Sequence, residues 1–294
     1  MHAEPFAERL MRAVSLRGSA ACVGLDPVLD RLPEPCRGTD PVASIERFSL
    51  GVMEAVAPLV PCVKLQAACY ERYGERGVAA YRRLVAAGRA LGLLVIGDAK
   101  RGDIGVSSDH YAWGCLADQD GSPGPDALTV NAYLGIDGIE PFIRLAAAQG
   151  KGLFALVRTS NPGGDALQSQ PLRDGRTVSE LVADLVAQAG QPFVGASGYS
   201  LLGAVVGATK PADVASLRAR MPEQIFLVPG FGAQGGSAAD VRACFHAGGR
   251  GALVTASRSV IFAHAERGAP TGPWAVAVSD AAKRMIDELR AAVG

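Results

Sequence analysis

The chain has 294 residues, and its 29 basic side chains balance 29 acidic ones, so the formal net charge at neutral pH is zero. This balance leaves no overall positive field that would attract nucleic acid or an acidic membrane surface. Hydrophobic residues make up 49% of the sequence, which supplies a large core and excludes disorder for most of the chain.

Six cysteines are scattered along the chain without a CxxC pair, a spacing that fits neither structural zinc nor a disulfide framework. Cys22 and Cys62 lie in apolar runs, as small buried side chains do in a reducing compartment. Charged residues interrupt the apolar N-terminus, and the longest apolar stretch, 51–63, contains Glu54 and two prolines. Because neither segment resembles a signal peptide or a span of about 20 apolar residues, we predict a cytoplasmic protein without a membrane partner.

Short apolar runs recur along the chain, and most are followed by a polar or glycine-rich turn and a helix-like segment. The predicted strands are Ala21–Leu25, Cys62–Leu65, Leu93–Gly97, Ala127–Val130, Leu153–Val157, Ala204–Val206, Ile225–Val228 and Ala252–Val254. Their continuous apolar character is typical of strands buried on both faces, as in a parallel sheet. The predicted amphipathic helices include Val42–Val56, Gly77–Leu91, Val178–Ala189, Ala238–His246 and Ala275–Val293.

This alternation of strands and helices indicates a (β/α)8 TIM barrel, with residues 1–294 as a single domain that has an N-terminal helical extension. An open, doubly wound sheet is the alternative, because counting strands does not show that the sheet closes. The proline- and glycine-rich stretches 120–126 and 161–175 are interpreted as loops of this one domain. In a (β/α)8 barrel the chemistry lies at the carboxyl ends of the strands.

Charged side chains stand at three of these strand ends. Asp26 follows the first apolar run, Lys64 the second, and the block Asp98, Lys100 and Asp103 the third. Only five residues of the chain are lysines, so two of them at neighbouring strand ends form a distinctive pattern. Alternate residues of a strand share a face, which predicts that Asp98 and Lys100 both point into the barrel mouth.

Two acids and two lysines in one pocket could be an ion-pair network that only specifies the fold. They could also do chemistry. A lysine between carboxylates stays an ammonium, which makes it a poor amine nucleophile but a good proton donor. Beside a carbon that is losing CO2, such an ammonium stabilises the developing carbanion and then protonates it. The cluster therefore favours metal-free decarboxylation.

A glycine-rich segment, 230–236, follows the seventh predicted strand, and Arg258 follows the eighth. The segment formally matches a GxGxxG dinucleotide motif, but only one strand follows it and no acidic ribose ligand stands about 20 residues further on. In a barrel, the loops after strands seven and eight bind phosphate through backbone amides and a helix N-terminus. We therefore predict a phosphate site here.

Polar loops also follow the fourth and fifth predicted strands. The fifth strand leads into Arg158-Thr-Ser160-Asn161-Pro-Gly-Gly164, a long segment whose hydroxyl and amide groups could contact the edge of a heterocycle or form an ordinary surface loop. The fourth leads into Thr129-Val-Asn131-Ala-Tyr133, which is also polar after an apolar run.

Taken together, these residues resemble the orotidine 5′-phosphate decarboxylase family in its longer bacterial form, the type 2 subfamily. The motifs that carry the resemblance are Asp98-Ala-Lys100-Arg-Gly-Asp103-Ile104, Asp26, Lys64, Gly232-Ala-Gln234-Gly-Gly236 and Arg258. It extends over nearly the whole chain and implies conversion of orotidine 5′-phosphate to UMP, the last step of de novo pyrimidine nucleotide synthesis. It also implies a homodimer with active sites at the subunit interface and no metal or organic cofactor.

The resemblance implies a role for each matching residue. Lys100 would protonate C6 of the pyrimidine, Asp98 would crowd the departing carboxylate, and Lys64 would hold the charge tetrad together and bond the ribose. The resemblance also implies that the neighbouring subunit's site receives three residues of this chain, Asp103, Ile104 and Ser107.

It also implies how the rest of the nucleotide is bound. Asp26 would bind ribose hydroxyls, and Ser160 would contact the pyrimidine edge. Gln234 and Arg258 would hold the phosphate. The backbone would approach the phosphate closely at Gly232 and Gly235.

Other interpretations of the same residues stay open. A magnesium-dependent sugar-phosphate decarboxylase or aldolase would share the DxKxxD block, but such relatives carry a metal-binding glutamate where this chain has Lys64. A Schiff-base aldolase would need a lysine with a lowered pKa, whereas flanking aspartates raise it. An NADP-dependent oxidoreductase built on the glycine-rich loop and a non-catalytic phosphate-binding module are the remaining alternatives.

Overall fold

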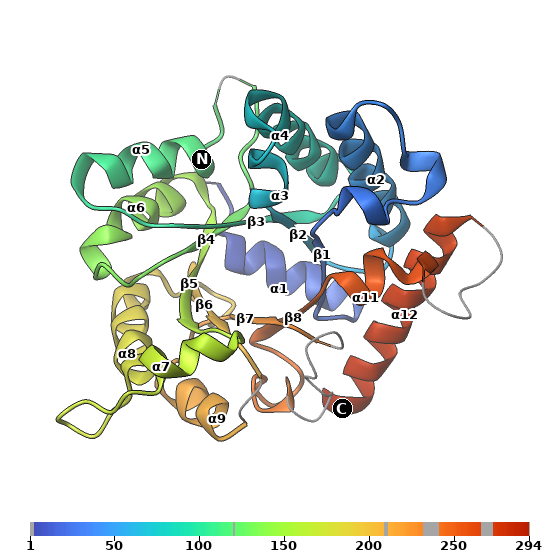
Figure 1. The fold of residues 1–294 in the computed structure, drawn as a ribbon. Helices are drawn as coiled ribbons and strands as arrows, with labels where there is room; N and C mark the ends of the chain where they lie inside the picture. The colour runs from blue at the N-terminus through green and yellow to red at the C-terminus, as the bar shows by residue number, and fades with distance from the viewer. Residues whose placement is uncertain (1–2, 120, 209–210, 232–240, 266–272, 294) are drawn as a thin grey trace.

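A closed barrel of parallel strands forms the centre of the molecule (Figure 1). The computed structural model describes residues 3–119, 121–208, 211–231, 241–265 and 273–293. Each strand pairs with the next along the chain, and β8 pairs with β1. The strands are β1 (Ala21–Leu25), β2 (Cys62–Gln66), β3 (Leu94–Arg101), β4 (Ala127–Val130), β5 (Gly152–Arg158), β6 (Leu202–Val206), β7 (Phe226–Pro229) and β8 (Ala252–Ala256). This closure confirms the (β/α)8 barrel and rules out the open sheet.

Helices surround the ring of strands (Figure 1). They are α1 (Phe6–Arg17), α2 (Pro41–Val56), α3 (Ala68–Glu71), α4 (Gly74–Ala90), α5 (Gly105–Cys115), α6 (Glu140–Gln149), α7 (Asp165–Gln168), α8 (Val178–Gly190), α9 (Pro211–Arg220), α11 (Arg258–Ile261) and α12 (Trp274–Val293). The predicted helices that correspond to α2, α4, α8 and α12 are confirmed.

The predicted helix Ala238–His246 is wrong at its C-terminal end, and its first residues lie outside the described part of the chain. Helical residues end at Arg242, and the backbone N–H of His246 donates to the carbonyl of Arg250 at 2.9 Å. Gly248 and Gly249, with φ of 78° and 71°, provide the left-handed backbone of the turn between His246 and Arg250.

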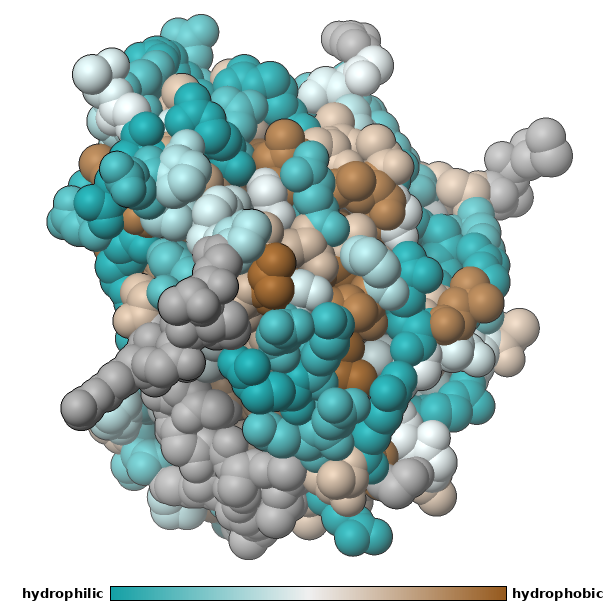
Figure 2. Space-filling model, turned by 90° about the vertical axis from the view of Figure 1, so that its right-hand side faces the viewer, coloured by the Kyte–Doolittle hydropathy of each residue, from teal (hydrophilic) through white to brown (hydrophobic). Residues whose placement is uncertain are grey.

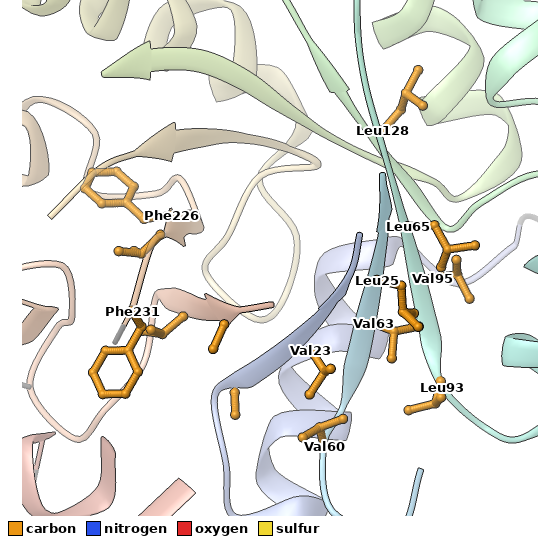
Figure 3. Close-up of a cluster of buried hydrophobic side chains, with 14 of the residues drawn as sticks. Val23, Leu25, Val60, Val63, Leu65, Leu93, Val95, Leu128, Phe226 and Phe231 are labelled. Carbon is orange, nitrogen blue, oxygen red and sulfur yellow. The ribbon is translucent and has the colours of Figure 1, made fainter. Parts of the chain in front are cut away.

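The strands alternate between two apolar layers, as a period of two requires. Val23, Val63 and Val95 belong to the layer between the barrel and its helices, and Figure 3 shows these side chains beside one another. Cys22 and Cys62, one residue earlier on β1 and β2, belong to the second layer, inside the barrel. Both cysteines are fully buried and free, as the sequence predicts.

Helix α1 closes the end of the barrel where the strands begin. Its buried Phe6 packs edge-on against Phe154, which lies inside the barrel, with ring centroids 6.0 Å apart. Arg9 of the same helix forms a 2.6 Å ion pair with the buried carboxylate of Asp126. Because this end is plugged, the functional pocket is confined to the carboxyl ends of the strands.

The side of the molecule over α2 and α12 shows hydrophobic side chains as small separate areas among hydrophilic ones (Figure 2). Within the described ranges, none of the helices combines the length and apolar character that crossing a bilayer requires.

Candidate active site

A pocket of about 550 Å³ opens at the carboxyl ends of the strands. Its wall includes the sequence-predicted residues Asp26, Lys64, Asp98, Lys100, Ser160 and Arg258. A second hollow, of about 600 Å³, lies at the plugged end between α1 and α12, but neither a carboxylate nor a lysine lines it. The charged pocket at the open end is therefore the candidate active site.

Asp98 is the centre of the charged cluster. It lies in the part of β3 that continues beyond the predicted end of this strand, and it is 6% exposed. Lys64 Nζ lies 2.6 Å from Asp98 Oδ2, and Lys100 Nζ lies 2.5 Å from Asp98 Oδ1. Asp26 Oδ1 is 4.0 Å from Lys64 Nζ. The structure therefore brings together four of the predicted charged residues, with Asp98 and Lys100 on the same face of β3 as expected.

The protonation of the cluster follows from these contacts. Burial alone would raise the pKa of Asp98, but attraction to Lys64 and Lys100 outweighs it and lowers that pKa to about 2. Burial likewise disfavours the Lys64 ammonium, yet Asp98 and Asp26 overcome this penalty and raise the pKa of Lys64. Asp98 therefore stays a carboxylate and Lys64 an ammonium at neutral pH.

The opposite wall of the pocket is apolar. Leu156 of β5, Val205 of β6 and Leu227 of β7 line it, across from the charged residues of β1, β2 and β3. In such a pocket the apolar side chains pack against a bound ring, and the polar groups of the other wall fix its orientation.

A further cation lies at the predicted phosphate end. Arg258 is the first residue of α11, two positions after the end of β8, and its exposed side chain lines the pocket. Gly230 and Phe231, after β7, line the same wall, and Gly230 has a φ of 90°, which favours glycine. The predicted residues Gly232, Gln234 and Gly235 lie outside the described residues.

The loop after β5 forms part of the pocket rim through Thr159, Ser160 and Asn161. Arg158, the last residue of β5, is not among the residues that line the pocket, and its side chain is 4% exposed. It donates to Asp165 at 2.5 Å and lies 3.3 Å from Asp213, so it links α7 to α9. Arg158 therefore stabilises the loop after β5 and is not placed to contact a molecule in the pocket.

Three predicted residues do not line the pocket of their own chain. Asp103 accepts a 2.8 Å hydrogen bond from the backbone of Ile104, and Ile104 and Ser107 are exposed at the start of α5. Asn131 is also absent from the pocket wall, since its side chain accepts from the backbone of Tyr133 in a turn.

Several pocket residues were not assigned to the site from the sequence, although Thr129 belongs to the polar segment noted after the fourth predicted strand. Gln66 donates to Asp98 Oδ2 at 3.2 Å, and Thr129 donates to Asp98 Oδ1 at 2.9 Å. Thr255 and Ser257 line the pocket from β8 and the residue after it. A period of two from Lys64 gives Gln66, so the strand pattern contained a signal for this residue.

Acidic and basic side chains that converge at the strand ends, with an arginine at the start of the following helix, define the class of this protein. It is a (β/α)8-barrel enzyme with a charged pocket for a small molecule at the carboxyl ends of its strands.

Comparison with known proteins gives the family. Residues 22–269 match the model of the orotidine 5′-phosphate decarboxylase / HUMPS family. The chain is 45% identical to the orotidine 5′-phosphate decarboxylase of Rhodopirellula baltica, covering 97% of this chain and 99% of the relative. It is 42% identical to that of Deinococcus radiodurans, covering 98% of each. The chain belongs to this family and is a carboxy-lyase.

A solved structure agrees with this assignment. A Streptomyces avermitilis protein assigned as orotidine 5′-phosphate decarboxylase superposes with a TM-score of 0.85 at 40% identity. The match covers 100% of this chain and 97% of the other.

Proposed function

We propose that this enzyme converts orotidine 5′-phosphate to UMP in the cytoplasm, as the closing step of pyrimidine nucleotide synthesis, and that it does so without a metal ion. The observation that carries the mechanism is the Lys64–Asp98–Lys100 cluster at the base of the pocket. The names and near-complete coverage of the relatives support the substrate.

In the proposed reaction, the bond between C6 of the pyrimidine and its carboxylate breaks, and CO2 leaves. The electron pair stays on C6, where the Lys100 ammonium stabilises it and then supplies a proton, which leaves Lys100 as the neutral amine until solvent reprotonates it. Asp98, ionised by its two lysine neighbours, disfavours the substrate carboxylate. Lys64 keeps Asp98 in place and reaches the ribose.

The rest of the nucleotide is assigned by the chemistry of the wall. In the described part of the chain, Asp26 Oδ1 is buried without a hydrogen-bond partner, and ribose hydroxyls would donate to it. Arg258, together with Gln234 and the backbone at Gly232 and Gly235, would hold the phosphate. Ser160, on the rim, would contact the pyrimidine edge.

We further propose that two copies of the chain share their sites. Asp103, Ile104 and Ser107 stand outside their own pocket, at the junction of β3 and α5. Ile104 and Val106 are 59% and 70% exposed, which suits burial against a second subunit. Asp103 would then be the fourth member of the charge tetrad in the other copy's site, beside the residues equivalent to Lys64, Asp98 and Lys100.

The main alternative is a magnesium-dependent decarboxylase or aldolase for a sugar phosphate. Lys64 argues against it, because an ammonium 2.6 Å from Asp98 occupies the carboxylate that a cation would need. The deciding experiment mixes purified protein with orotidine 5′-phosphate and EDTA and follows loss of the orotate ultraviolet absorbance. Turnover is expected. No turnover at micromolar enzyme, or activity only with magnesium and a sugar phosphate, would overturn the proposal.

A further inference from the structure

The strands β3 and β4 lose their regular pairing at the charged cluster. Gly97 pairs with Leu128 and Arg101 pairs with Val130, so the three residues 98–100 of β3 lie opposite a single residue of β4, Thr129. This is a β-bulge, in which the extra residues of one strand have no backbone partner on the other.

Lys100 lies in this bulge with an unusual backbone. Its φ is 50°, and among the described residues no other non-glycine residue has a positive φ. A lysine in the left-handed region is held at a cost of about 1 kcal/mol or more, so the surrounding structure must stabilise it.

The hydroxyl of Thr129 supplies that support. It accepts a 2.9 Å hydrogen bond from the backbone N–H of Lys100 and donates its own proton to Asp98 Oδ1, also at 2.9 Å. Thr129 is 1% exposed, so neither bond exchanges easily with bulk water. A single oxygen therefore fixes the backbone of Lys100 and the carboxylate of Asp98 at the same time.

We propose that Thr129 is a positioning residue, which sets the direction of the Lys100 ammonium toward the substrate by acting through the bulge and through Asp98. The inference rests on the proposed function, because it matters only if Lys100 delivers the proton. Without the hydroxyl, the Lys100 N–H loses its partner and Asp98 Oδ1 keeps only the Lys100 ammonium. The reacting groups then sample orientations that do not lead to proton transfer.

The test compares Thr129→Val, which keeps the shape but removes the hydroxyl, with Thr129→Ser, which keeps the hydroxyl. Loss of hydrogen bonding to a charged group is expected to lower kcat by about 10- to 100-fold in the valine variant. KM should change less than about threefold, because the phosphate and ribose contacts are intact. The serine variant should retain kcat within about threefold of wild type, since its hydroxyl makes the same two bonds.

Wild-type turnover by Thr129→Val would overturn the inference, and so would a loss of turnover by about 10-fold or more in folded Thr129→Ser. The serine variant keeps the inference open to refutation if the valine variant does not fold. Lys100→Ala is measured in parallel. If it turns over like wild type, the proposed mechanism itself fails, whereas an inactive Lys100→Ala beside a fully active Thr129→Val removes only the role of Thr129.

Discussion

The ammonium of Lys64 lies 2.6 Å from Oδ2 of Asp98, and both side chains are only 8% exposed. Two charges held this far from water stabilise each other, but removing one leaves the other buried and unpaired, which destabilises the fold. The pair therefore couples the stability of the fold to the ionisation of the candidate active site.

The first prediction concerns stability in acid. The pKa of Asp98 falls from an ordinary 3.8 to about 2 in the folded protein, so its contribution is complete above pH 3.8 and is lost as the pH falls through about 2. The expected size is about 2 kcal/mol of unfolding free energy. The unfolding free energies of wild type and Asp98→Asn, measured by urea denaturation, should differ less at pH 2 than at pH 5. A difference that does not change with pH would contradict the prediction.

The second prediction separates charge from proton delivery at Lys100. Lys100→Arg keeps a cation next to Asp98, but an arginine, whose pKa is far above 12, does not readily release a proton to carbon. Both Lys100→Arg and Lys100→Ala should lose at least about 1000-fold in kcat, in the range of general acid catalysis. Circular dichroism should show intact folds. Wild-type kcat in Lys100→Arg would mean that Lys100 acts by its charge alone.

The third prediction tests the phosphate end of the pocket. Arg258→Ala should lower kcat/KM by about 10- to 100-fold, mainly through KM, because one charge-assisted contact to the phosphate is removed. Some loss of kcat is expected if phosphate binding closes the loops. Arg83→Ala is the matched control, because Arg83 is 58% exposed and pairs with Glu46 away from the pocket. An unchanged kcat/KM in Arg258→Ala would refute the phosphate assignment.

Much of the barrel could be predicted because strands buried on both faces are continuous apolar runs, and charged residues interrupt them only where the pocket begins. What could not be predicted depends on register. The bond from Thr129 to Asp98 joins residues 31 positions apart, and it exists because β3 bulges against β4.

Side-chain direction at a strand end was equally hidden. The sequence places Arg158 beside Ser160 at the start of a polar loop, but only Ser160 lines the pocket. Arg158 is instead drawn to the carboxylates of Asp165 and Asp213, and Asp213 lies 55 residues further along the chain. A local pattern cannot contain such a partner, because it comes from the way α9 packs.

The last prediction concerns the plugged end of the barrel, where stability and activity should separate. Arg9 of α1 forms a 2.6 Å ion pair with Asp126, which is 2% exposed and also accepts a 2.9 Å hydrogen bond from the backbone of Val95. Arg9→Met removes the nearer of the two cations that pair with this buried carboxylate and leaves the Arg89 guanidinium 3.9 Å away, so it should lower the unfolding free energy by about 2 kcal/mol. Turnover below the unfolding transition should be unchanged, because the pocket lies at the other end.

Arg12→Met is the control for this variant. Arg12 lies on the same helix, but its ion pair with Glu4 is exposed, so its loss should lower the unfolding free energy much less than the loss of Arg9 does. Urea denaturation of both variants, with kcat measured on the folded enzymes, checks the prediction. Equal destabilisation by the two substitutions would show that α1 is held by its apolar face alone, and a loss of kcat in folded Arg9→Met would show that the plug communicates with the active site.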